Sequence, residues 1–209
     1  MSNRTRTALA MCVAALALAL VAGAASADRA LGIAPGGAIE AVSEGVVTFF
    51  AKNGEFTVTC RTTFRGELRR EVMKVGGTRM GEISEGTTAE CRTSNREPAT
   101  VTLLVERAEP FSINYGTFLG TLPELITGIQ AGIPLFRFQV NAGLLRCLYQ
   151  GALAILILFP PGEEGGGTRF NRVRFVTPNN IPTTTMMCPR EAEVRGELRL
   201  TPAQRLTLR

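Results

Sequence analysis

Apolar and polar residues alternate in several short runs of this chain, and a period of two is the signature of β-strands. The run FTVTC at 56–60 is the first example, and its threonines are β-branched residues that suit a strand. Further runs lie at 101–105, 136–140, 172–175, 194–200 and 206–208. Many short strands of this kind predict a mainly β fold, an antiparallel β-sandwich or a partly open barrel.

Turn signals separate these runs, and one segment between them has helical spacing instead. The turn signals are Lys52-Asn53-Gly54, Gly76-Gly77, Pro178-Asn179-Asn180 and Thr201-Pro202. The helical apolar positions are Leu122, Leu125, Ile126 and Ile129, preceded by Thr121 and Glu124 as a capping box with Pro123 in the first turn. We expect one short helix here, as a connector or as a lid over one open end of the sheets.

The amino terminus has the three parts of a secretory signal peptide. Arg4 and Arg6 precede an uncharged run at 8–22, and Ala25-Ser26-Ala27 supplies the small residues of a cleavage site. We therefore expect a signal helix at 1–27, a flexible linker at 28–37 and a single β domain at 38–209, with Asp28 as the first mature residue. An uncleaved membrane anchor is the alternative; after cleavage we expect no transmembrane segment.

Four cysteines remain after cleavage: Cys60, Cys91, Cys147 and Cys188. In an exported chain an even set of cysteines indicates disulfides, and four cysteines allow three connectivities. A zinc site is the rival, but no two of these cysteines have the close spacing of a zinc knuckle. Because each is nearest to its partner in sequence, we expect the pairs Cys60–Cys91 and Cys147–Cys188.

Composition excludes several kinds of chemistry. The chain has no histidine, which removes Ser-His and Cys-His nucleophile pairs and every histidine-containing metal site. Asp28 is the single aspartate, so calcium loops are absent too. Removing Arg4 and Arg6 from the 23 basic residues leaves 21 against 18 acidic residues, a formal net charge of +3. We predict no catalytic residue, no metal site and no cofactor.

The most hydrophobic stretch, at 144–162, has two interpretations. As a membrane span it is too short, and Arg146 and Gln150-Gly151 interrupt it. As two buried strands joined near Gln150-Gly151, it places Cys147 toward a disulfide partner and ends at Pro160-Pro161. We favour the two core strands, and keep exposure of the stretch to a membrane or partner as the alternative.

Candidate chemical groups are few. The glycine-rich loop at 162–167 lacks the lysine and hydroxyl of a phosphate-binding loop, so a hairpin loop is the simpler interpretation. Neighbouring glutamates could in principle serve a hydrolase, which needs two carboxylates on opposite sides of the bond it cleaves. These pairs are Glu82 with Glu85, Glu163 with Glu164, and Glu191 with Glu193. We interpret them as solvated positions on strands and loops.

Arginines could form ladders on two strand faces, and such ladders suit polyanions. Arg172 and Arg174 share one strand face, and Arg195 and Arg199 share another. Glutamates, among them Glu197, interleave with the second ladder. Cross-strand pairing of opposite charges is therefore the preferred interpretation, and polyanion binding the alternative.

The motifs together resemble a loose group of uncharacterised secreted proteins from high-GC Gram-positive bacteria. They are Cys60 with Phe64-Arg65-Gly66, Cys91, Pro110-Phe111-Ser112-Ile113, Cys147-Leu148-Tyr149-Gln150-Gly151 and Cys188-Pro189 before a glycine-containing last strand. The resemblance covers most of the mature chain. It implies a disulfide-containing β domain at the cell exterior and carries no catalytic residue.

We therefore expect a secreted, non-enzymatic protein with a structural or ligand-binding role at the cell envelope or outside the cell. Its expected partner is a cell-envelope component or another secreted protein, and not a nucleic acid. A secreted hydrolase with paired glutamates is one alternative. A membrane-active or polyanion-binding protein is the other.

Overall fold

The computed structural model describes residues 30–51, 57–121, 125–158, 168–177 and 180–208, and within these ranges it contains strands but no helix. The strands are β1 (Ala30–Ala34), β2 (Gly37–Ser43), β3 (Val47–Ala51), β4 (Thr57–Leu68), β5 (Glu71–Met73), β6 (Arg79–Thr93), β7 (Ala99–Leu103), β8 (Phe111–Thr121), β9 (Leu125–Ala142), β10 (Leu145–Leu158), β11 (Thr168–Val176), β12 (Ile181–Pro182) and β13 (Glu191–Leu208). The predicted mainly β, antiparallel architecture is confirmed. The expected signal helix and cleavage site, at 1–27, lie outside the described residues.

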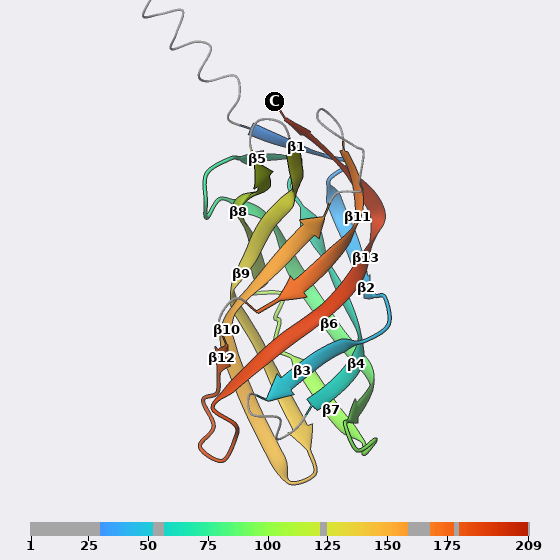
Figure 1. Cartoon of the computed structure of the whole chain (residues 1–209), viewed down its shortest axis with the longest axis vertical. Coiled ribbons are helices and arrows are strands. Elements are labelled where there is room, and N and C mark those ends of the chain that lie inside the picture. Colours follow the sequence, from blue (N-terminus) through green and yellow to red (C-terminus); the bar gives the residue numbers. More distant parts are fainter. Residues whose placement is uncertain (1–29, 52–56, 122–124, 159–167, 178–179, 209) are drawn as a thin grey trace, which may run out of the picture.

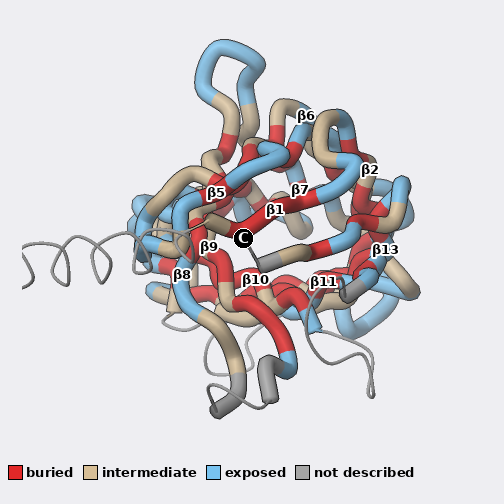
Figure 2. Tube along the Cα trace, turned by 90° about the horizontal axis from the view of Figure 1, so that it is seen from above, coloured by how far each residue is buried: buried red, intermediate tan, exposed pale blue. Residues whose placement is uncertain are grey.

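The strand pairings form a ring. Hydrogen-bonded neighbours follow the order β11, β10, β9, β8, β6, β4, β2 and β13, and β13 pairs again with β11. Figure 1 shows these strands inclined around the long axis of the molecule. Strands β1 and β5 lie at the upper end, β7 and β12 at the lower end, and Figure 2 shows β1 crossing the upper end of the ring.

The core fills the inside of this ring because alternate residues of each strand point inward. In β4 the even-numbered residues from Val58 to Phe64 are buried, whereas Arg61 and Arg65 are exposed. The lower half contains an aromatic cluster around Phe138 of β9. Its ring centroid lies 5.1 Å from that of Phe49, 5.7 Å from that of Phe136 and 5.2 Å from that of Tyr149.

Two disulfides connect the predicted partners. Cys60 of β4 bonds to Cys91 of β6, across 31 residues of sequence. Cys147 of β10 bonds to Cys188, in the segment between β12 and β13, across 41 residues. The connectivity expected from sequence proximity is therefore the one present.

The structure differs from the expected linker at 28–37. Ala30–Ala34 forms β1, which pairs with both β13 and β5, and Gly37 begins β2. Leu31 and Ile33 are buried in the core. Two backbone ladders and two buried side chains integrate this segment into the domain, so the linker prediction is wrong from Ala30 onward.

The predicted helix is also absent from the described residues. Leu125–Ala142 is a single strand, β9, with β8 on one edge and β10 on the other; Leu122, Pro123 and Glu124 lie outside the described residues. Ile129 pairs with Phe118 and with Ile157. Ladders on both edges outweigh a local helical spacing, since strand preference depends on the neighbours that a segment finds.

The hydrophobic stretch forms one strand instead of two. β10 continues from Leu145 to Leu158, and the expected break near Gln150-Gly151 is a register irregularity between Gly151 and Leu153. Pairing with β9 continues on both sides of this irregularity, because a bulge absorbs an extra residue without ending a strand. Over the part of the chain that the structure describes, no helix is long and apolar enough to cross a membrane.

The turn expected at Thr201-Pro202 lies inside β13. This strand pairs with β2 up to Thr201 and with β1 from Arg205 onward. Proline has no backbone N–H to donate, so it is tolerated where the ladder changes partner. The turn at Gly76-Gly77 is confirmed; it connects β5 to β6, and Gly77 has a φ of 86°.

Candidate functional site

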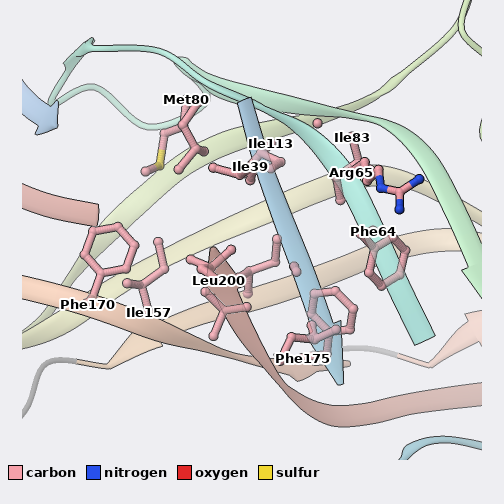
Figure 3. Close-up of a pocket in the computed structure, with 16 residues that line it drawn as sticks. Ile39, Phe64, Arg65, Met80, Ile83, Ile113, Ile157, Phe170, Phe175 and Leu200 are labelled. Carbon is pink, nitrogen blue, oxygen red and sulfur yellow. The ribbon is translucent and has the colours of Figure 1, made fainter. Parts of the chain in front are cut away.

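An apolar hollow lies inside the upper half of the ring. Strands β2, β4, β6, β8, β10, β11 and β13 all contribute to its lining. Figure 3 shows side chains from opposite sides of the ring converging on this space, among them Ile39, Phe64, Met80, Ile157, Phe170 and Leu200.

The register of the strands brings these residues together. Ala41 of β2 pairs with Phe64 on one side and with Leu200 on the other. In the same way, Val173 of β11 pairs with Ile157 and with Leu198. Paired residues on neighbouring strands point to the same face, so the alternation in each strand becomes one continuous apolar wall.

The hollow has a volume of about 50 Å³. An apolar cavity of about 150 Å³ binds benzene, so this hollow accepts only the end of a hydrocarbon chain. Ala41 leaves room on one side, because it carries only a methyl group. Met80 borders the other side with a flexible thioether that can adopt several shapes around a guest.

Among the described residues that line the hollow, Arg65 is the one with an ionisable side chain. Arg65 borders it, but Figure 3 shows its guanidinium directed away from the apolar side chains. Its Nε donates to Glu40 Oε1 at 2.9 Å, and Glu85 lies 3.6 Å from its Nη1. The hydrogen bond to Glu40, with the charges of both carboxylates, raises the pKa of Arg65 above its ordinary value. The described lining is therefore apolar apart from Arg65, and it suits an apolar group.

The glutamates of the hydrolase alternative have separate partners. Glu82 accepts from Arg79, and Glu85 lies beside Arg65. Glu191 accepts from Asn180 at 2.7 Å, and Glu193 accepts from Arg195 at 2.6 Å. None of these four residues lines the apolar hollow. Glu163 and Glu164, with the glycine loop at 162–167, lie outside the described residues.

The arginine ladders pair with glutamates, as the interleaved charges predict. Arg174 of β11 lies opposite Glu197 of β13, and its Nε donates to Glu197 Oε1 at 2.8 Å. Glu44 accepts from Arg199 at 2.7 Å and forms an ion pair with Arg172 at 3.0 Å. Each member of the two ladders therefore has a carboxylate beside it, as Arg195 has in Glu193.

A second, polar hollow of about 490 Å³ lies where β2 ends and β3 begins. Four of its lining residues have hydroxyl groups: Ser43, Thr62, Thr63 and Thr87. Ser43 Oγ, at the end of β2, accepts a hydrogen bond from the N–H of Thr62 in β4 at 3.0 Å. The charged lining residues, Arg61 and Glu90, neutralise each other at 3.3 Å.

The environment of Tyr115 gives a pH prediction. Tyr115 is buried beside Phe118, and this burial raises the pKa of its phenol. The folded state disfavours the phenolate, so its contribution to stability is complete below about pH 10 and is lost as pH rises through the raised pKa. A Tyr149→Phe variant leaves Tyr115 as the only tyrosine, and its ultraviolet titration should begin above that of free tyrosine. Titration at the ordinary value would contradict the prediction, and adding Tyr115→Phe to the Tyr149→Phe variant should abolish the signal.

Sequence reasoning named no binding residue, and it missed both hollows. The available signal was the small residue Ala41 among large apolar ones, but its significance depends on which strands face it. Among the described residues, no group of three or more cysteine, aspartate or glutamate side chains could hold a metal ion. Comparison with known proteins finds no matching protein family, no matching curated protein and no matching solved structure.

Proposed function

We propose that this chain is an exported, non-enzymatic protein that binds the apolar end of a ligand at the cell envelope or outside the cell. The observation that carries the proposal is the apolar hollow inside a ring whose described arginine, lysine and glutamate side chains lie outside the core. An interior of this kind suits retention of a hydrocarbon group and offers nothing for bond cleavage. The closed circuit of pairing favours a partly open barrel over two separate sheets as the frame around it.

Export is part of the same proposal. The two disulfides support it, because such bonds persist in oxidising compartments and are rare in a reducing cytosol. The signal-peptide pattern at the amino terminus points the same way. The ligand we propose is a cell-envelope component with a hydrocarbon chain, which agrees with the resemblance to secreted proteins.

Filling the hollow tests the proposal. Ala41→Leu adds three carbon atoms at the apolar lining, so we expect it to weaken the binding of dodecanoate at least about tenfold while the fold is retained. The matched control is Ala38→Leu on the exposed face of the same strand. Binding is measured by nuclear magnetic resonance with an isotope-labelled terminal methyl group, which should show a nuclear Overhauser effect to Met80.

Equal dodecanoate affinity in the two variants would show that the hollow is not the binding site. Contacts of the labelled methyl group elsewhere than at Met80 would show the same. Hydrolysis of the probe or of its esters by the purified protein would favour the hydrolase alternative.

A further inference from the structure

The lower end of the molecule carries apolar side chains at the corners of two tight turns. Leu144 follows Gly143, with a φ of 57°, in the two-residue turn between β9 and β10. Met186 and Met187 occupy the middle of a turn closed by the hydrogen bond from the Cys188 N–H to Thr185 O. Turn corners normally carry glycine, proline, asparagine, aspartate or serine.

These side chains do not contribute to the core. Leu144 is 105% exposed, Met186 is 102% exposed and Met187 is 86% exposed, whereas Leu145 beside them is 38% exposed. The sequence placed Leu144 at the start of a buried stretch, and this placement is wrong. Side chains that are fully in water give the fold no stabilisation, so folding does not account for their apolar character.

The two turns are held together as one surface. The disulfide Cys147–Cys188 connects them, and Cys188 Sγ lies 3.5 Å from Arg146 O. Thr185 Oγ1 accepts from the Leu148 N–H at 3.2 Å, so the methionine turn is anchored on both sides. Figure 1 shows the β9–β10 connection and the β12–β13 connection at the same lower end. We call Leu144, Leu145, Met186 and Met187 the apolar tip.

Unneutralised positive charge accompanies the apolar tip. Arg146 and Arg190 are exposed, and neither forms an ion pair with another described residue. Glu191, the nearest carboxylate along the chain to Arg190, accepts a hydrogen bond from Asn180. Arginines of the two ladders differ, since each has a carboxylate beside it.

We infer that the apolar tip inserts into the surface of a lipid bilayer that carries anionic headgroups. Two narrow convex turns suit a deformable interface, whereas a stable protein interface needs roughly 800 Å² on each partner. The leucine and methionine side chains would enter the boundary between headgroups and acyl chains. Arg146 and Arg190 would remain at headgroup level, where anionic lipids attract them. This inference does not depend on the apolar hollow, which lies in the opposite half of the molecule.

Vesicle flotation of the mature protein, from Asp28 onward, tests this inference. The mature protein should float with vesicles of equal parts phosphatidylcholine and phosphatidylglycerol, and less with phosphatidylcholine alone or at high salt. Leu144→Ser with Met187→Ser should lower the bound-to-free ratio about tenfold or more, since two apolar side chains are lost from the interface. Arg146→Glu with Arg190→Glu should lower it about tenfold for the mixed vesicles, while binding to phosphatidylcholine alone changes little.

Matched controls lie at the other end of the molecule. Met73→Ser with Val75→Ser removes two exposed apolar side chains near β5, and Arg69→Glu with Arg70→Glu reverses two exposed charges there. Both controls should float like the parent protein. Circular dichroism and a thermal melt establish that each variant is folded.

Three results would overturn the inference. The first is a parent protein that does not float with the mixed vesicles. The second is equal loss of flotation in the tip variants and in their controls. The third is a dimer in solution that Leu144→Ser with Met187→Ser dissociates, since the tip would then be an interface between two copies of the chain.

Discussion

Replacing Phe138 by alanine should lower the free energy of unfolding by about 4 kcal/mol, within the range of roughly 3–5 kcal/mol typical of buried phenylalanines. Phe138 is fully buried, and its ring contacts those of Phe49, Phe136 and Tyr149. The substitution removes the transfer free energy of one ring and takes one aromatic contact from each of three other rings. Urea unfolding with the disulfides intact measures the loss.

Leu135→Ala is the matched control for this prediction, because Leu135 lies on the same strand with 48% of its surface exposed. We expect a change of about 0.5 kcal/mol or less for this variant. If Phe138→Ala were no more destabilising than Leu135→Ala, the aromatic cluster would not be the core of the lower half.

The double substitution Cys147→Ala with Cys188→Ala should cost about 4 kcal/mol, and the melting temperature should fall by roughly 8–16 °C. The disulfide closes 41 residues, and removing it lets the unfolded chain explore many more conformations. Replacing both cysteines avoids a free thiol that could exchange with the other disulfide. Differential scanning calorimetry measures the change.

Cys60→Ala with Cys91→Ala provides the comparison. Its loop of 31 residues predicts a similar cost, because closure entropy depends only on the logarithm of loop length. A loss below about 1 kcal/mol in either double variant would contradict the chain-entropy account of that disulfide. Vesicle flotation should fall in the Cys147→Ala with Cys188→Ala variant, because Cys188 anchors the methionine turn, and should not fall in the Cys60→Ala with Cys91→Ala variant.

The apolar hollow and the apolar tip lie at opposite ends of the same ring of strands. The upper half retains a small apolar space, and the lower end exposes apolar side chains with arginines that have no acidic partner among the described residues. If both proposals hold, the protein would bind an apolar group while resting on a lipid surface. Each experiment above can fail without affecting the other, because Ala41 and Leu144 are on different elements.

Alternation predicted the strands well where neighbours on both sides were strands. The run at 56–60 is within β4 from Thr57, and the runs at 194–200 and 206–208 are within β13. The sequence-based prediction failed at Leu125, Ile126 and Ile129, where the spacing of apolar residues indicated a helix and the structure has a strand. A Cβ atom at Gly128 would lie 2.4 Å from Ile157 O, so a glycine here allows β10 to approach closely. This reason becomes visible only when the paired strand is known.

The candidate sites could not be predicted in the same way. Ala41 borders a hollow because it pairs with Phe64 and with Leu200 across two ladders. These partners are 23 and 159 residues away in the sequence, so the pairing is not a local property. Leu144 is exposed because a two-residue turn carries it past the last pair of β9 and β10. The sequence showed an apolar residue in both positions and did not show on which side of the sheet, or beyond which strand end, each would lie.

The sequence by itself determined the strand-rich character of the chain, because the period of two is a local property. It indicated one cysteine pairing among three possible connectivities, and it indicated that arginines and glutamates would pair. The partner of Arg199, however, is Glu44, which lies 155 residues away in the sequence. The tertiary structure alone decided that β11 closes on β13, that 30–34 joins the sheet, and where the hollow and the apolar tip lie. Those features depend on which distant strands become neighbours, and that choice is made by the packing of the whole core.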